Sequence, residues 1–247
     1  MAQKKGKKAL PRPAPPPPPN PLGGLELDAR RLQRQQTVEA LRQGRTPLTV
    51  IELAEGAVAL AEQNLAQAQE REPPPPLACK EGCDWCCYMR VGTAVPEVAR
   101  IVAYLRRTLS PDEFHVVRQR VVQLAELRRE LGSRKRADPR LPCPLLAEHR
   151  CLAYPVRPLT CRGCNSTDAQ ACERFVHLGP KEPIPAYEPQ HRLSTFVLDG
   201  LRAGLAEARL PGDLLELTAA LQIALEVPEA VERWLTGEPV FARARLD

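Results

Sequence analysis

The chain has 247 residues, of which 43% are hydrophobic and 4% are aromatic, and its formal net charge is +5. This length allows one sizeable domain or two small ones with an aliphatic core, so folding does not require disulfide bonds. The excess positive charge lies in residues 1–24, and the rest of the chain holds equal numbers of basic and acidic residues. The charge therefore gives no support for nucleic acid as a partner, since nucleic-acid binders usually carry a basic face on the folded part.

The start of the chain lacks the apolar segment of a secretory signal. No apolar run approaches the roughly 20 residues of a membrane span. We therefore expect a cytoplasmic protein that does not associate with membranes. In that reducing compartment, a dense group of cysteines is typical of metal binding or redox chemistry rather than of disulfides. The odd number of cysteines, nine, also excludes complete pairing within the chain.

Residues 1–24 are basic and rich in proline. This composition predicts a disordered tail with polyproline II character, because it offers little apolar surface to bury. A protein partner that reads proline-rich sequence could dock on such a tail. Composition alone does not distinguish this docking role from a solvated tail.

Residues 25–72 are predicted to form N-terminal helices, because their apolar residues recur at helical spacing. The second helix is expected to begin at Thr49, since Thr49 and Glu52 form a capping-box pattern. Four successive prolines at 73–76 end this region directly before the first cysteines. The apolar residues that define the first helix are Leu25, Leu32, Val38 and Leu41.

Two more helices are predicted after the first cysteines. One covers residues 96–109, and the next begins at Ser110, where Ser, Pro, Asp and Glu in succession form a strong N-terminal signal. We expect these helices to form a hairpin that brings the first cysteine segment, 79–87, next to the second, 143–172. Residues 138–189 are repeatedly broken by proline and are expected to be irregular, with short turns.

Residues 190–247 return to a helical pattern and are predicted to pack on the cysteine region. No run of alternating or continuously apolar residues indicates a strand. The predicted fold class is therefore mainly α, with a helical scaffold around a loop-rich, cysteine-ligated metal centre. The metal-binding domain is expected to span residues 77–175.

The cysteines fall into two groups with the spacing of metal ligands. A C-x2-C spacing lets two thiolates on one turn reach the same ion. The sequence contains two such pairs, and together they supply the four thiolates of one site. The full order is Cys79, Cys83, Cys86 and Cys87, followed by Cys143, Cys151, Cys161, Cys164 and Cys172.

Cys86 and Cys87 are adjacent, and neighbouring side chains point apart in extended backbone. One of the two is therefore expected to bind the primary centre. The other binds a second metal, packs as a small apolar residue or acts as a reactive thiol. The thiols exceed what one tetrahedral centre needs, so a polynuclear or double site is open. His149 is an alternative ligand, whereas Asp84 and Glu81 are expected to be solvated.

Two enzyme classes compete with simple metal binding. A cysteine nucleophile needs an activating base, and no Cys–His pair stands out in the sequence. The spacing Cys79-x3-Cys83-x2-Cys86, with the aromatic Trp85, matches the [4Fe–4S] triad of radical S-adenosylmethionine enzymes. That triad normally opens a partial βα barrel. No succession of strand and helix patterns follows it here, so this class is less favoured.

Two blocks of the sequence resemble a known family. CKEGCDWCCYMRV at 79–91 is followed by CPLL at 143–146 and by CLAYPVRPLTCRG at 151–163. This order is similar to that of the YkgJ-type cysteine-cluster family, whose domain has a CxxCxxCC-type core and is described as zinc- or iron-chelating. Flagellin lysine methylases carry a similar cysteine domain that is associated with an iron–sulfur cluster, which favours iron. The resemblance covers residues 77–175.

The resemblance implies that the chain chelates zinc or iron, as Zn²⁺ or as a [4Fe–4S] cluster. Thiolate suits both metals, so ligand type does not decide between them. Cys164 joins the candidate ligands through its C-x2-C spacing, and the role of Cys172 is open. The ligands that the resemblance implies are Cys79, Cys83, Cys86, Cys87, Cys143, Cys151 and Cys161.

Arg157 and Arg162 flank the last ligand block. A metal held by four thiolates carries net negative charge, and a nearby guanidinium can stabilise it by donating hydrogen bonds to sulfur. We expect this supporting role for both arginines, with Tyr154 packed beside the site.

Three functions remain open from the sequence. The first is a metal-binding protein whose centre is structural, redox-active or used in metal delivery. The second is an enzyme, methylase-like or radical S-adenosylmethionine-like, whose iron–sulfur centre supports modification of a protein or small molecule. The third is a zinc-stabilised module that binds a protein partner through its proline-rich tail and its helical C-terminal segment.

Overall fold

The computed structural model describes residues 22–133, 140–179 and 182–246. Helices dominate these ranges, and the strands are only two residues long, so the predicted mainly α fold is confirmed. No helix in the described ranges is both long and apolar enough to cross a membrane.

Most of the predicted tail lies outside the described residues. The expected disorder of residues 1–21 and their docking role therefore stay predictions. Leu22 belongs to the folded part, because it is 2% exposed and packs against Ala68 and Leu193. The folded chain thus begins slightly earlier than the predicted boundary at residue 25.

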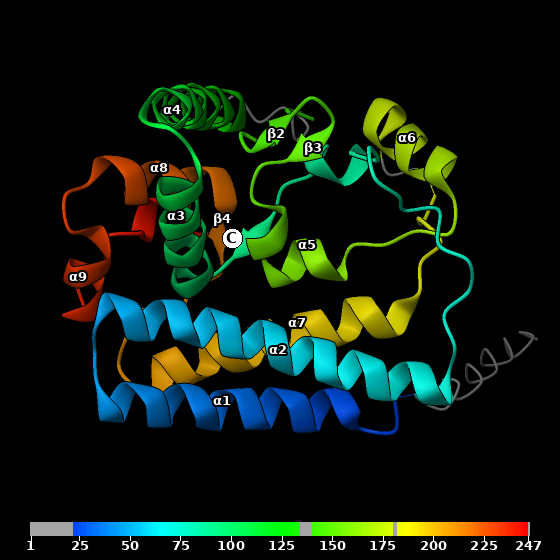
Figure 1. Cartoon of the computed structure of the whole chain (residues 1–247), viewed down its shortest axis with the longest axis horizontal. Coiled ribbons are helices and arrows are strands. Elements are labelled where there is room, and N and C mark those ends of the chain that lie inside the picture. Colours follow the sequence, from blue (N-terminus) through cyan, green and yellow to red (C-terminus); the bar gives the residue numbers. More distant parts are fainter. Residues whose placement is uncertain (1–21, 134–139, 180–181, 247) are drawn as a thin grey trace, which may run out of the picture.

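Three long helices form one layer of the molecule: α1 (Leu25–Gln43), α2 (Pro47–Arg71) and α7 (Glu188–Glu207) (Figure 1). The predicted start of α2 at Thr49 is wrong by two residues. Thr46 caps the helix instead, because its hydroxyl accepts a hydrogen bond from the Thr49 backbone N at 3.1 Å. Pro47 follows at the first helical position, where its missing N–H costs no hydrogen bond.

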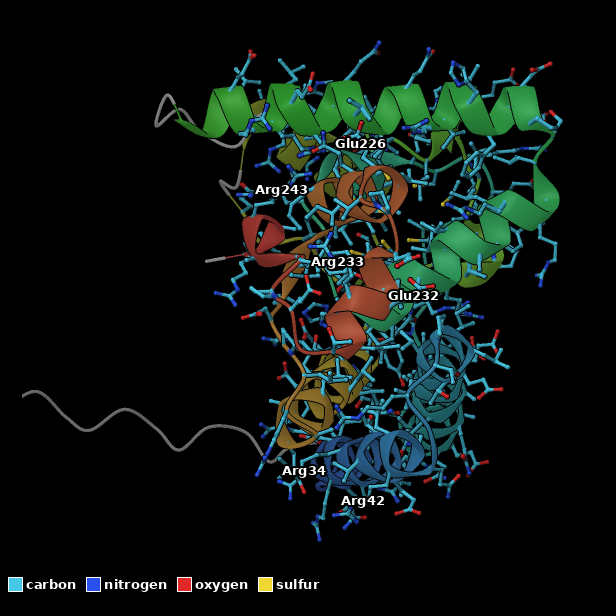
Figure 2. The ribbon with its side chains drawn as sticks, turned by 90° about the vertical axis from the view of Figure 1, so that its left-hand side faces the viewer. Arg34, Arg42, Glu226, Glu232, Arg233 and Arg243 are labelled. Atoms are coloured by element: carbon cyan, nitrogen blue, oxygen red, sulfur yellow. The ribbon has the colours of Figure 1, made fainter. Side chains whose placement is uncertain are left out.

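α3 (Val95–Thr108) and α4 (Pro111–Ser133) lie close to their predicted bounds. The predicted capping signal is present: the Ser110 hydroxyl and backbone N donate to Glu113 Oε2 at 2.7 and 2.8 Å. The predicted side-by-side hairpin is absent, because α4 lies across one end of α3 (Figures 1 and 2). Each helix packs on the C-terminal helix α8 (Leu217–Glu226), a contact between residues 190–247 and the region 77–175.

The C-terminal elements α8, α9 (Ala230–Leu235) and the short 3-10 helix η3 (Ala242–Ala244) follow α7. Figure 2 shows α8 and α9 between α4 and the three-helix layer. Trp234 anchors α9, since it is fully buried and its indole N–H donates to the Pro211 carbonyl oxygen at 3.1 Å.

Two small antiparallel strand pairs, which the sequence pattern did not indicate, close the cysteine region. β1 (Gly92–Thr93) pairs with β4 (Leu215–Glu216), and β2 (Leu146–Ala147) pairs with β3 (Arg150–Cys151). The registers are Gly92 opposite Glu216 and Leu146 opposite Cys151. Strands of two residues carry too little periodicity to be read from sequence.

The second cysteine segment is more regular than predicted. It contains the 3-10 helix η2 (Tyr154–Val156), α5 (Leu159–Gly163) and α6 (Ala169–Leu178). Asp168 caps α6 by accepting hydrogen bonds from the backbone N of Gln170 at 2.8 Å and of Ala171 at 3.2 Å. An Asp in this position is a sequence signal for a helix start, although the surrounding prolines favour irregular structure.

One hydrophobic core joins the segments that the sequence separated. It includes Ala29 of α1, Val98 of α3, Leu159 of α5 and Trp234 of α9, all at most 2% exposed. The cysteine region is therefore built onto the same core as the helices on either side of it.

Candidate metal centre

A cavity of about 520 Å³ lies where the two cysteine segments meet. The first segment contributes the 3-10 helix η1 (Trp85–Tyr88) and the turn before it, and the second contributes the β2–β3 hairpin and α5. Leu145, Leu217 and Val91 provide apolar parts of the wall. The cysteines that line this one cavity are Cys83, Cys86, Cys87, Cys143, Cys151, Cys161 and Cys164.

A tight turn places Cys83 at the cavity. The backbone N of Cys83 donates to the Lys80 carbonyl oxygen at 3.0 Å. Gly82 occupies the third position of this turn with φ +83°, a conformation that L side chains rarely adopt. The turn lets the chain reverse between Cys79 and Cys83.

Cys86 and Cys87 line the same cavity, although extended backbone was expected to point them apart. The difference arises because both lie on η1, a 3-10 helix, where successive residues turn by about 120° rather than 180°. A hydrogen bond links the two thiols. The backbone N of Cys87 donates to the Asp84 carbonyl oxygen at 2.8 Å, which closes the first turn of η1.

The second cysteine segment is tied directly to the first. The backbone N of Cys143 donates to the Cys87 carbonyl oxygen at 2.7 Å. Cys151 ends β3 and pairs with Leu146 across the hairpin. The side chains of Cys143, Cys151 and Cys161 pack against the hydrophobic core, so its rigid framework supports these three thiols.

The buried carboxylate of Glu97, which the sequence analysis missed, positions α5. Glu97 accepts hydrogen bonds from the Thr93 hydroxyl and Ala94 N, both at 2.9 Å, and from Leu159 N at 2.7 Å. It therefore joins the start of α3 to the start of α5, which carries Cys161. Its place at the third position of α3 was a capping signal, but nothing local indicated the bond to Leu159.

Cys79 and Cys172 do not line the cavity and lie around Ser166. The Cys79 thiol is 3.9 Å from the Ser166 carbonyl oxygen, and Cys172 hydrogen-bonds the Ser166 side chain. Ser166 is 1% exposed, and its carbonyl also accepts from Ala78 N at 2.8 Å. No sequence signal points to Ser166 beyond its place in a polar turn.

Five of the seven cavity thiols have a raised pKa, which favours their protonated form. Burial raises the pKa of Cys143 and of Cys164 to about 12 and raises that of Cys161 well above the usual value. Cys86 is the exception: the hydrogen bond from Cys87 lowers its pKa to about 7. Metal binding at these thiols must release protons, because the thiolate is the ligand.

Arg157 lies at the cavity as predicted for a supporting cation. It lowers the pKa of Cys86 and of Cys151, opposing the effect of burial on Cys151. Its Nε is buried and has no hydrogen-bond partner among the described residues. Tyr154 also lines the cavity, is 59% exposed and stacks on the Arg157 guanidinium at 3.9 Å.

Arg162 has other partners. Its guanidinium donates to Glu62 Oε1 on α2 and to the Pro155 carbonyl oxygen, both at 2.7 Å, and to the Arg157 carbonyl oxygen at 3.1 Å. The structure thus shows Arg162 connecting η2 and α5 to α2, whereas a hydrogen bond to sulfur stays a prediction.

The expected solvation of Asp84 is wrong, because Asp84 is 8% exposed and its Oδ2 lies 2.9 Å from His149 Nδ1. Both residues line the cavity. His149 sits in the β2–β3 turn at φ +61°, beside Glu148 at φ +48°. A carboxylate that fixes one imidazole nitrogen is a common arrangement around metal-binding histidines, so His149 stays a candidate ligand.

Among the described residues, no three cysteine, histidine, aspartate or glutamate side chains are grouped closely enough to hold a metal ion in the arrangement shown. The thiols share a cavity without converging on one point. Comparison of the chain with protein-family models, curated proteins and solved structures found no match. The resemblance to the YkgJ-type family therefore rests on the cysteine motifs alone.

Proposed function

We propose that this chain binds zinc or iron, the latter as ions or as a [4Fe–4S] cluster, through the cysteines around the cavity. The observation that carries the proposal is the meeting of seven thiols from two distant segments at one cavity. Unligated cysteines rarely gather in this way in a reducing compartment, where the same pattern is typical of metal sites. The proposal includes the cytoplasmic location expected from the sequence, because a reducing compartment keeps these thiols available for metal.

The donor set fits a thiophilic metal. Thiolates are preferred ligands of zinc and of iron–sulfur clusters, and the candidate ligands here are almost all thiols. Arg157 supplies a positive charge and a buried N–H without a partner, both of which suit an anionic metal–thiolate centre. Ligation would require the thiol side chains to turn toward a common point and to lose their protons.

The proposed role of the metal is to hold residues 77–92 and 140–175 together. These segments contain few long helices, and several of their cysteines are only partly buried. A metal that links both segments replaces apolar packing with coordinate bonds, as in other small metal-stabilised regions.

An iron–sulfur-dependent modification enzyme is the second candidate. The cavity volume of about 520 Å³ favours it, because this volume falls in the range of about 300–1,000 Å³ typical of small-molecule sites. Arg157, His149 and Tyr154 place polar groups around the same space. The third candidate is an interaction module that uses the proline-rich tail, most of which lies outside the described ranges, and the C-terminal helical segment.

Metal and acid-labile sulfide content of anaerobically purified protein tests the proposal, read together with visible absorption. Near-equal iron and sulfide in a brown protein would establish a cluster and raise the enzyme candidate. Stoichiometric zinc without sulfide would establish a zinc centre. Protein that contains neither metal, and that takes up neither after anaerobic reconstitution, would refute metal binding.

A further inference from the structure

The nine cysteines differ in what surrounds them, and the difference divides them in space. Cys143, Cys151 and Cys161 pack against the hydrophobic core. Cys87 is joined to them through the 2.7 Å hydrogen bond from Cys143 N to its carbonyl oxygen. Burial raises the pKa of Cys161, and the thiols of Cys143, Cys164, Cys86 and Cys151 raise it further. These four residues form an inner set of thiols.

A second group surrounds Ser166. Cys79 and Cys172 contact opposite ends of this residue, its carbonyl oxygen and its hydroxyl. Burial raises the pKa of Cys172, and the thiols of Cys83 and Cys86 add to the increase. Cys164 belongs here as well, because it lies two residues before Ser166 in the chain. Burial raises its pKa, and the thiols of Cys86, Cys172 and Cys79 raise it further. The outer set is therefore Cys79, Cys83, Cys164 and Cys172.

Helix α6 brings Cys172 to this group. α6 packs against η1, and the ring of His177 on α6 meets the ring of Trp85 on η1 edge to face at 5.5 Å. The Asp168 cap and the hydrogen bonds of Ser166 fix the start of α6 next to Ala78. Cys172 thus lies one helical turn beyond an anchored cap, on a helix docked to the first cysteine segment.

Cys86 lies between the two sets. Its thiol raises the pKa of thiols in both sets, although burial has the larger effect in each case. The thiols affected are Cys151 and Cys161 in the inner set and Cys79 and Cys172 in the outer set. Arg157 also acts on both, because it opposes the raised pKa of Cys151 and of Cys164.

We propose that the chain carries two adjacent thiolate centres, an inner one at Cys87, Cys143, Cys151 and Cys161 and an outer one at Cys79, Cys83, Cys164 and Cys172, with Cys86 between them. Each set offers the four thiolates that a thiophilic cation such as zinc prefers. This inference rests on the proposed metal binding and extends it. It gives Cys172 a role as a metal ligand. It also divides the C-x2-C pair of Cys161 and Cys164 between the inner and the outer centre.

Anaerobic titration of the metal-free full-length chain with Co²⁺ alone tests the partition. Tetrahedral cobalt–thiolate coordination has characteristic visible and charge-transfer absorption, which counts bound ions without any assay of activity. The wild-type chain is expected to bind at least two equivalents. The double substitution Cys79→Ala and Cys172→Ala should remove one equivalent and leave the other with full thiolate absorption, because both residues lie outside the cavity.

The matched variant is Cys151→Ala, which should weaken the inner equivalent and leave the outer one. Circular dichroism of each variant is the control that checks whether its helices are intact. One equivalent in the wild-type chain, or two that survive the double substitution, would overturn the partition while metal binding stands. Loss of all binding in the double variant would show one shared centre. No cobalt uptake by the wild-type chain, together with no zinc or iron, would overturn the proposed function as well.

Discussion

The three-helix layer of α1, α2 and α7 and the cysteine region are held together by different forces. In the layer, small side chains let the helices approach closely: a Cβ on Gly200 of α7 would collide with the Arg30 carbonyl oxygen of α1. Long apolar and Ala-rich faces are buried there, including Val50, Ala57 and Leu201, none of which is exposed. Such packing is sufficient to stabilise helices without any ligand.

In the cysteine region, individual polar bonds add to the packing on the hydrophobic core. Glu97 holds the start of α5, Ser166 holds residues 77–79 to the start of α6, and Arg162 connects η2 to α2. Most of its cysteines are partly buried, and none of them forms a disulfide. Under the proposed metal binding, the helical layer folds on apolar burial and the cysteine region gains additional rigidity from the metal.

Metal removal should produce the largest difference in stability between the two regions. Structural zinc sites contribute on the order of 10 kcal/mol, so chelation should speed amide hydrogen exchange in residues 77–92 and 140–175 by about 100-fold or more. Exchange within α1, α2 and α7 should change far less. Hydrogen-exchange mass spectrometry of the holo and chelated protein measures both. Equal protection of the cysteine region with and without metal would show that the metal does not stabilise the fold there.

Gly200→Ala should destabilise the three-helix layer rather than the cysteine region. The added Cβ meets the Arg30 carbonyl oxygen and lies 2.9 Å from Gln33 Cβ, so overpacking should lower the free energy of unfolding by about 1–3 kcal/mol. Metal content per chain should not change. Chemical denaturation gives the free energy, and metal analysis gives the content.

Gly56→Ala in α2 is the matched control for that substitution. Nothing lies within 4 Å of a Cβ at Gly56, which is exposed on the helix. Here Ala should stabilise by about 0.5–1 kcal/mol through helix propensity alone. Destabilisation of similar size at both glycines would mean that close helix contact is not the reason for Gly200.

Arg157→Gln should have the smallest effect on the stability of the fold, but it should weaken metal affinity. Removal of a group that supports metal ligands typically weakens metal affinity 10- to 100-fold, and we expect this range here. Arg150→Gln is the control, because Arg150 also lines the cavity but forms an exposed ion pair with Glu81 at 3.0 Å. Competition with a chromophoric chelator measures both affinities. An equal loss of metal affinity in the two variants would mean that Arg157 acts through the overall charge of the cavity rather than through contact with the thiolates.

The sequence by itself determined the helical elements and the cysteine-rich composition of the cavity lining. Helical spacing of apolar residues and the Ser110–Glu113 capping pattern are local signals, and the structure shows helices where they occur. The thiol-rich pattern likewise identified all seven cysteines that line the cavity. Local signals succeed here because a helix and its cap are formed by residues only a few positions apart.

Only the tertiary structure decided how the cysteines are divided and what supports them. Cys86 and Cys87 face one cavity because η1 is a 3-10 helix, and Cys172 reaches Ser166 because α6 docks on η1. The bond from Glu97 to Leu159 and the pair of Asp84 with His149 join residues far apart in the chain. Such contacts leave no periodic or local mark in the sequence, since they depend on how separately formed elements pack in space.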